Sequence, residues 1–250
     1  MKNGKPNLSA PIPRASAGKP DLSGVWLHEL TSPAEIKRLF SAFAAELDAS
    51  PIGMEAGTAH KYAFNILIDK KPGEVELTPK GDAMMKKRAA EQDPSNVCHG
   101  EYGWPVAGLL TEPFKIVQTP NLTLVLYEID SLRRQIFNDG RKFPATFEFP
   151  AYLGYSIGRW EGDTFVVETR GFNERTPLDA MGHPRSENIH VTERYRRRDF
   201  GHMDIGYTFD DPQVYTKPIT VHIPHTLIPN NDIFEMFCNQ NEKDRGHMVK

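Results

Sequence analysis

The second half of the chain repeats one pattern that constrains the fold more than any other feature: short runs of β-branched and aromatic residues separated by turn residues. Such runs are typical of strands. Turn chemistry stands between several of them, at Asn138-Asp139-Gly140, Glu161-Gly162-Asp163 and Asp210-Asp211-Pro212, and predicts antiparallel hairpins. The strands expected here are 114–119, 122–129, 133–137, 152–160, 164–169, 187–197, 203–209, 219–223 and 233–238.

Consecutive strands with few helices between them favour an antiparallel meander that closes into a barrel, because closure removes exposed strand edges. We therefore predict a mainly β fold with a barrel of about eight to ten strands, a size that holds a core or one small ligand. Residues 20–250 are expected to form a single domain, and residues 1–19, rich in Pro, Lys, Ser and Ala, to form a flexible leader.

The first part of the chain adds two peripheral helices and two short strands, at 21–26 and 62–68. Ser32 can cap a helix, Pro33 suits its first position and Glu35 completes a capping box. The second helix is expected over 78–91. Apolar residues at helical spacing extend the first helix along Ile36, Leu39, Phe40, Phe43 and Leu47.

The charge balance excludes several partner classes. With 30 basic and 33 acidic residues, the chain has no overall field that would attract nucleic acid or an anionic membrane. No apolar stretch is long enough to span a membrane, and the N-terminus lacks the apolar core of a secretory signal. The composition of the leader resembles a tether left after removal of such a signal, which favours a periplasmic or secreted mature form. A cytoplasmic location is the alternative.

Metal and cofactor sites are not indicated. Cys98 and Cys238 are too few for a thiolate metal site and could form either one disulfide or two free thiols. His222 and His225 are three residues apart on a predicted strand, where they would project to opposite faces. No metal is therefore expected, and because no dinucleotide or phosphate-loop motif is present, no cofactor is expected either.

Five motifs resemble a widespread family of uncharacterised bacterial proteins: PDLSGVW at 20–26, FKIVQTP at 114–120, RQIF at 134–137, GRWEGDT at 158–164 and HVTERY at 190–195. The resemblance spans residues 20 to about 243. It implies an exported protein with a lipocalin-like barrel, and it implies no particular activity. Where the family pattern has Pro-His-Ser, this chain has Pro184-Arg185-Ser186, with His183 before the proline.

Two carboxylates are candidates for catalysis because they interrupt apolar strand faces. Glu193 is in register with Ile189 and Val191, and Glu235 interrupts the strand expected at 233–238 in the same way. Carboxyl groups in apolar surroundings have raised pKa values and can act as general acid and general base. The alternative is that each pairs with an arginine to stabilise the barrel. Candidate partners are Arg134, Arg159 and Arg194.

His190 lies on the strand face opposite Glu193, so only one of the two can face the interior. Histidine exchanges protons near neutral pH, which makes His190 a candidate base if its face is the inner one. The loop 176–186 places Asp179 and His183 where the mouth of a barrel collects ligand contacts. A turn-forming Asp179 and surface histidines are the alternatives.

Two functions are consistent with this sequence. The first is a cofactor-independent acid–base enzyme, a lyase, isomerase or hydrolase, that acts on a small hydrophobic or aromatic molecule. The second is a carrier of a hydrophobic ligand. A homodimer is compatible with either function. The expected catalytic residues are Glu193, Glu235, Asp179 and His190, and the expected substrate-binding residues are Arg134, Tyr155, Arg159, Trp160, His183 and Tyr215.

Overall fold

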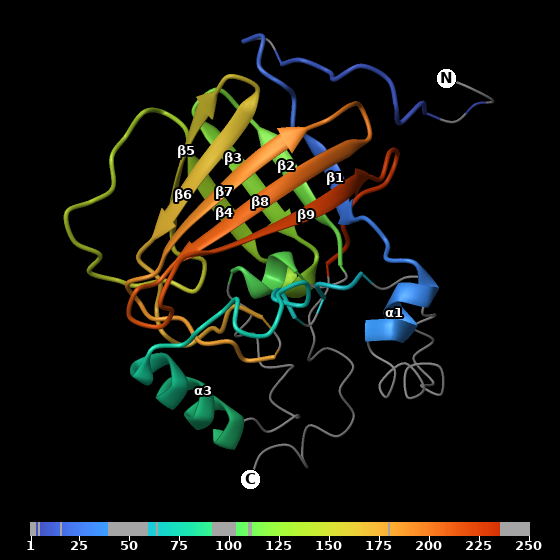
Figure 1. Ribbon diagram of the computed structural model, residues 1–250. Coiled ribbons are helices and arrows are strands. Elements are labelled where there is room, and N and C mark those ends of the chain that lie inside the picture. The colour runs from blue at the N-terminus through green and yellow to red at the C-terminus, as the bar shows by residue number, and fades with distance from the viewer. Residues whose placement is uncertain are drawn as a thin grey trace.

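A closed β-barrel is the centre of the structure (Figure 1). The computed structural model describes residues 4, 6–15, 17–39, 60–63, 65–91, 104–109, 112–179 and 181–235. The strands are β1 Gly24–His28, β2 Phe114–Gln118, β3 Leu122–Tyr127, β4 Arg133–Phe137, β5 Tyr155–Glu161, β6 Thr164–Arg170, β7 His190–Arg197, β8 His202–Asp210 and β9 Ile219–Leu227. The helices are α1 Pro33–Leu39 and α3 Pro79–Glu91, with 3₁₀ turns η2 Val106–Gly108 and η3 Ile129–Ser131. The predicted mainly β barrel fold is confirmed.

One joint of the barrel differs from the expected meander. All neighbouring strands run antiparallel except β4 and β5, which run parallel. In a closed ring of nine strands the direction cannot alternate all the way round, so at least one pair must be parallel. Parallel neighbours need a long connection, made here by residues 138–154. The hairpin predicted at Asn138-Asp139-Gly140 is therefore wrong, whereas Glu161-Gly162-Asp163 joins antiparallel β5 and β6.

The core lies inside the barrel and follows the alternation of the strands. On β7, Val191, Glu193 and Tyr195 are buried, whereas Arg194 and Arg196 between and beyond them are exposed. The side chains of β7 are thus divided between an inner and an outer face, as the alternation of a strand predicts. Large side chains that fill the interior include Trp26, Phe114, Ile116, Val125, Tyr127, Phe165, Ile205, Tyr207, Phe209 and Ile223.

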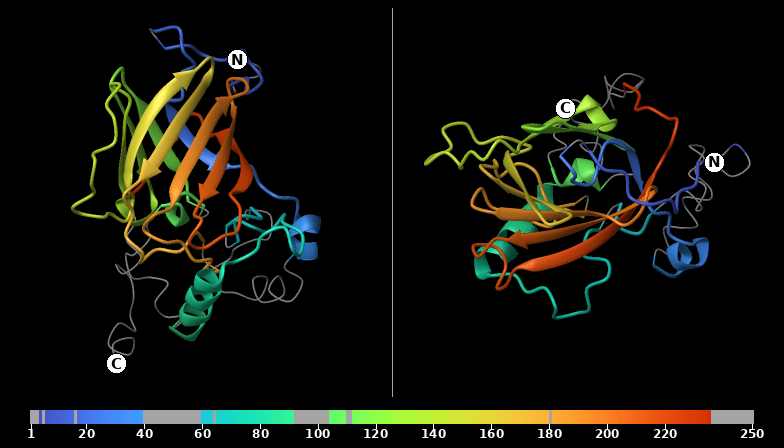
Figure 2. Two further views of the ribbon diagram at one scale, coloured as in Figure 1. Left: turned by 60° about the vertical axis from the view of Figure 1, so that its left-hand side comes forward. Right: turned by 90° about the horizontal axis from the view of Figure 1, so that it is seen from above.

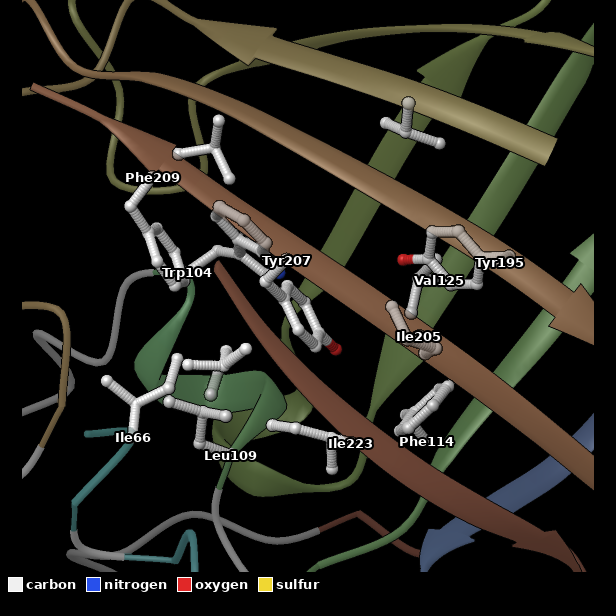
Figure 3. Packing of buried hydrophobic residues seen from close by; sticks show 14 of the residues in the cluster. Ile66, Trp104, Leu109, Phe114, Val125, Tyr195, Ile205, Tyr207, Phe209 and Ile223 are labelled. Atoms are coloured by element: carbon white, nitrogen blue, oxygen red, sulfur yellow. The ribbon is translucent and has the colours of Figure 1, made fainter. Parts of the chain in front are cut away.

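The two ends of the barrel are covered differently. We call the end next to η2 and α3 the lower end, and the end beside the N-terminal segment the upper end (Figure 1, Figure 2). Segments outside the strands close the lower end with the buried side chains of Ile66, Trp104 and Leu109. Figure 3 shows Trp104 beside Tyr207, with Ile66 and Leu109 near them. The apolar interior therefore continues past the strands into these segments.

Both predicted helices are present in the described part of the chain. The first begins at Pro33 and is described to Leu39, so its expected continuation to Leu47 lies outside the described residues. The second spans Pro79–Glu91. The strand predicted at 62–68 is wrong, because residues 62–63 and 66–68 form turns; the amide of Ile66 donates to Asp179 Oδ2 at 2.9 Å. Their apolar character reflects burial against the end of the barrel rather than pairing in the sheet.

The chain ends of the described structure lie outside the barrel wall. Residues 233–235 form no strand, which contradicts that part of the strand predicted at 233–238, and residues 236–238 lie outside the described residues. Part of the predicted leader contacts the upper end, where Leu8 and Ala10 accept hydrogen bonds from Gly201 and Phe200. Within the described ranges, no helix is long and apolar enough to cross a membrane.

Gly158 of β5 allows close packing inside the barrel. A Cβ at this position would lie 2.4 Å from Phe165 Cζ and 2.9 Å from Ile136 Cγ2. We predict that Gly158→Ala lowers the free energy of unfolding by about 1–3 kcal/mol, because overpacking a filled core forces side chains from their rotamers. Urea denaturation measures the effect. Gly108→Ala is the matched control, since its Cβ would meet no atom closer than 3.6 Å; equal losses in the two variants would contradict this explanation.

Candidate functional site

The interior of the barrel contains a buried ion pair between Arg134 of β4 and Glu193 of β7. Both side chains are almost completely excluded from solvent. Arg134 Nη1 donates to Glu193 Oε1 at 3.0 Å, and Nη2 forms a second, short bond to Oε2. Of the two orientations that the sequence left open for this strand, the structure has the one that turns Glu193 inward. Its partner is one of the three arginines considered as alternatives.

Polar side chains of neighbouring strands complete this ion pair. Arg134 Nε donates to Ser156 Oγ at 3.0 Å and Nη2 donates to Thr169 Oγ1 at 2.7 Å. Tyr195 donates its hydroxyl proton to Glu193 Oε1 at 2.6 Å. The indole of Trp104 lies 4.4 Å from the guanidinium carbon of Arg134. The pair thus has hydrogen-bond partners on all sides, as buried charges require.

The surrounding phenols stay protonated. Burial, reinforced by the charge of Glu193, raises the pKa values of Tyr195 and Tyr207 well above the ordinary range, and burial raises the pKa of Tyr127 to about 12. Burial alone lowers the pKa of Arg134, but the charge of Glu193 and its hydrogen bond raise that pKa above its usual value. These contacts correspond to the structural alternative for Glu193. They also occupy the guanidinium of Arg134, whose expected role as a substrate-binding group stays a prediction.

The remaining strand candidates lie away from the interior. His190 is half-buried on the outer face of β7, where Nε2 lies 3.4 Å from Glu168 Oε1. Glu235 is exposed and outside any strand, so the prediction that it faces inward is wrong. Arg159 is exposed and pairs with Glu168 at 2.6 Å. The structure therefore does not bring His190 or Glu235 together with Glu193.

Two aromatic candidates also lie outside the interior cluster. Tyr155 is half-buried and its hydroxyl accepts a hydrogen bond from Arg141 at 3.2 Å. Trp160 is half-buried and packs on Phe165 with 5.1 Å between ring centroids. Strand alternation puts Tyr155 on the face of β5 opposite the buried Ser156, whereas Trp160 shares the face of Ser156 and packs against the core at the other end of the strand. Neither contacts Arg134 in the described part of the chain.

The loop at the lower end brings Asp179 and His183 into contact. Asp179 is fully buried, and its Oδ2 lies 2.6 Å from Nδ1 of His183. The same carboxylate accepts backbone hydrogen bonds from Ile66, Met181 and His183. The imidazole keeps 21% of its side-chain surface exposed. Asp179 thus holds the ring by Nδ1 and leaves Nε2 directed elsewhere, the arrangement by which a carboxylate orients a catalytic histidine.

Two buried contacts fix the backbone after this histidine. Tyr215 donates its hydroxyl proton to the carbonyl of Pro184 at 2.8 Å. Asp211 accepts hydrogen bonds from the amide and the hydroxyl of Ser186, at 2.6 and 2.8 Å. Tyr215 was predicted to bind substrate, and its observed contact is instead with the loop that carries Asp179 and His183.

Arg185, between these two anchors, is a buried cation that has no carboxylate partner among the residues the structure describes. Its side chain is fully buried, and its one hydrogen bond runs from Nη1 to the carbonyl of Asn173 at 2.7 Å. Neither Nε nor Nη2 has a hydrogen-bond partner. Burial, with the nearby positive charge of Arg88, lowers the pKa of Arg185 to about 9. Sequence reasoning noted this residue as a departure from a family pattern and assigned it no role.

Sequence reasoning also missed a cluster of three buried histidines, which we call the histidine cluster: His28 of β1, His60 and His225 of β9. The rings of His28 and His60 stack with 3.9 Å between centroids, and His28 and His225 are 4.6 Å apart. They lie beside a cavity of about 230 Å³ that His28 and His60 line. Strand alternation could have indicated two of them, because His28 lies two residues after Trp26 and His225 two residues after Ile223, so each shares the inner face of its strand.

Two members of the histidine cluster, His28 and His225, are neutral at pH 7. Burial lowers the pKa of His28 well below its usual value, and it lowers the pKa of His225 to about 3, with the neighbouring imidazoles adding to both effects. His222 is exposed on the other face of β9, so its predicted separation from His225 is confirmed. Within the described ranges, no group of three or more His, Cys, Asp or Glu side chains is arranged to hold a metal ion. Cys98 and Cys238 lie outside these ranges.

Comparison with known proteins adds no identification. No protein-family model matches the chain, and no curated protein or solved structure matches it significantly. The resemblance to an exported bacterial family stays a prediction, and the geometry of the site is the basis for any functional conclusion.

The Arg134–Glu193 pair yields a test of its structural role. We predict that Glu193→Gln lowers the free energy of unfolding by about 3–5 kcal/mol, because it leaves a buried guanidinium without its counterion. The double variant Arg134→Met with Glu193→Leu is expected to be more stable than the single variant, since it removes both charges together. Urea denaturation of Arg134→Met, Glu193→Leu and the double variant measures the coupling. Additive losses would contradict this explanation.

The histidine cluster predicts an acid-sensitive fold. In the folded state His225 has a pKa of about 3 against an ordinary 6.5, so between these values the unfolded chain binds a proton that the folded protein excludes. The contribution of this histidine to the free energy of unfolding is therefore fully present above pH 6.5. Below pH 6.5 the free energy of unfolding decreases by about 1.4 kcal/mol per pH unit for each such histidine. His225→Phe should reduce this slope between pH 6.5 and 5 in denaturation experiments, whereas His222→Phe should not. Equal slopes in the wild-type protein and His225→Phe would contradict the assignment.

Proposed function

We propose that the protein is an acid–base enzyme that acts, without a cofactor, on a small hydrophobic or aromatic molecule at the lower end of the barrel. His183 is the proton-transfer group, and Asp179 is its orienting partner. The observation that carries this proposal is the 2.6 Å contact between the buried Asp179 carboxylate and Nδ1 of the partly exposed His183. It revises the roles expected from the sequence, because His183 takes the position of the base and Glu193 does not.

The geometry supports separate roles for His183 and Asp179. With its Nδ1 proton donated to Asp179, the imidazole presents the lone pair of Nε2 and can accept a proton from a substrate. The negative charge of Asp179 stabilises the imidazolium that forms, and the aspartate itself stays ionised. Three backbone amides hold the carboxylate in place. Proton removal followed by return of the proton elsewhere would give an isomerase, and loss of a leaving group would give a lyase.

The surroundings favour a small hydrophobic or aromatic substrate. The rings of Trp104 and Phe172 stack at the lower end with 5.9 Å between centroids, and the side chains of Ile66 and Leu109 are buried there. Polar groups on a mainly apolar wall are typical of small-molecule sites. The carrier function is the second candidate, supported by the complete pairing of the one carboxylate that β7 turns into the barrel.

We also propose that the mature protein is periplasmic or secreted. The support is the composition of residues 1–19, rich in Pro, Lys, Ser and Ala, together with the motif resemblance to an exported family. Part of this segment contacts the upper end of the barrel, away from the proposed site.

The first step of the test finds a ligand. A thermal-shift screen with phenolic, terpenoid and fatty molecules identifies compounds that bind the folded state, because such binding raises the apparent stability. Each compound that binds is then incubated with the protein and its conversion is followed by mass spectrometry and by exchange of substrate protons with deuterium. Deuterium exchange detects proton abstraction even when no net product accumulates.

The second step assigns the residues. We predict that His183→Gln lowers kcat/KM, or the exchange rate, about 10²–10⁴-fold because the proton acceptor is removed, and that Asp179→Asn causes a loss of similar size by changing the tautomer of the ring. His222→Gln is the matched control, since His222 is exposed on β9. Unchanged rates in folded His183→Gln would overturn the catalytic proposal. Binding without exchange or conversion in the wild-type protein would establish the carrier function instead.

A further inference from the structure

We propose that Arg185 is the binding group for an oxyanion, a carboxylate or phosphate carried by the ligand of the lower end. As a statement about the substrate, this inference rests on the proposed function, and it narrows the substrate class to hydrophobic or aromatic acids and their phosphate counterparts. As a statement about binding, it stands on the contacts of Arg185 alone.

The first observation is the unsatisfied edge of a buried guanidinium. Arg185 is fully buried, yet it has one hydrogen bond, from Nη1 to Asn173. The two nitrogens without partners are Nε and Nη2. Their N–H groups lie side by side on one edge of the guanidinium plane, and such an edge matches the two oxygens of a carboxylate or phosphate. The missing partner therefore has a defined shape and charge.

The second observation is that no side chain of the protein supplies this charge in the described part of the chain. Asp211 contributes to the electrostatics of Arg185, but both of its oxygens bind Ser186. Glu174 is exposed and makes no hydrogen bond to Arg185. The largest influence after burial is instead a second cation, Arg88 of α3, which together with burial disfavours the charged form of Arg185. A bound anion would offset both the burial of the guanidinium and the repulsion from Arg88, because buried charges are stable only when they are paired.

The third observation is that the guanidinium is held in place. Its face packs on Phe172, whose ring centroid lies 4.6 Å from Cζ. The residues on either side are fixed, since Pro184 accepts the Tyr215 hydroxyl and Ser186 binds Asp211. A guanidinium stacked on a ring and fixed through its backbone loses little freedom when it binds a ligand. His183 lies two residues before it, so the proton-transfer group and the anion-binding group belong to one anchored segment.

The fourth observation is that stacked aromatic rings connect Arg185 to the buried Arg134. Phe172 stacks on Trp104, and Trp104 covers the guanidinium of Arg134, which is neutralised by Glu193. The two buried arginines thus occupy opposite ends of one aromatic stack. Arg134 has an internal carboxylate, whereas Arg185 has none. This difference indicates that the second position is reserved for a carboxylate or phosphate from outside the chain.

The experiment measures binding of benzoate, of inorganic phosphate and of benzamide, the neutral isostere of benzoate, by thermal shift and calorimetry at pH 7. We expect an oxyanion to raise Tm by roughly 5–10 °C at about a hundred times its Kd, and benzamide to bind at least about 30-fold more weakly than benzoate because it lacks the charge. Stabilisation by benzoate identifies a carboxylate ligand. Stabilisation by phosphate alone identifies a phosphate ligand.

Variants assign the binding to this residue. Arg185→Met should bind the oxyanion at least about 30-fold more weakly than the wild-type protein does. Without anion it should be as stable as the wild-type protein, because it removes an unpaired buried charge and keeps the packing on Phe172. Arg185→Lys keeps the charge but not the paired N–H edge, and it should bind about tenfold or more weakly than the wild-type protein. Arg196→Met, on the exposed face of β7, is the matched control and should bind normally.

Two results would overturn the inference: oxyanion binding that survives in Arg185→Met, or the absence of any stabilisation of the wild-type protein by benzoate and phosphate. If Arg185→Met does not fold, Arg185→Lys decides through its affinity. The outcome is separable from that of the proposed function, because His183→Gln should still bind the oxyanion. Binding retained in His183→Gln with unchanged turnover would remove the catalytic proposal and leave the anion site in place.

Discussion

The ion pair between Arg134 and Glu193 holds together the weakest joint of the barrel. A ring of nine strands must contain a parallel pair, and here β4 and β5 meet only at Ile136 with Ser156 and Phe137 with Ile157. Arg134 spans this joint from inside, since it bonds Ser156 across the seam and Glu193 on the far wall. Because both charges are buried, each is stable only in the presence of the other. The positions of the loops at the lower end depend on this closed wall, and therefore on the ion pair.

The residues that we propose for proton transfer and anion binding lie in a loop that contacts with the rest of the structure hold in place. Asp179, His183 and Arg185 belong to one segment between β6 and β7, and contacts from Ile66, Tyr215 and Asp211 hold it at several points. Loops positioned by a rigid scaffold are where binding and catalytic groups commonly lie. A proton-transfer group beside an anion-binding group is the arrangement that acid–base chemistry on an organic acid requires. The barrel interior contributes stability to this site and supplies no reacting group in our proposal.

Several elements of the fold could be read from the sequence because they depend on local physics. Alternation along β7 put Glu193 and Arg194 on opposite faces, and the capping residues before Pro33 and Pro79 located two helices. The segment at 62–68 could not be assigned in this way. Its apolar residues face the end of the barrel, and an apolar run has the same appearance whether it pairs in a sheet or covers one. The histidine cluster was missed for a related reason, because its three members come from segments far apart in the chain.

The sequence by itself determined the mainly β fold, the alternation of its strands and the presence of polar groups in the loop at 176–186, since all of these follow from spacing along the chain. Only the tertiary structure decided which partners those groups meet. It paired Glu193 with Arg134, left Glu235 outside, joined Asp179 to His183 and buried Arg185 without a counterion. The physical reason is that the state of a charged side chain depends on burial and on neighbours in space, and strand order and loop anchoring determine both.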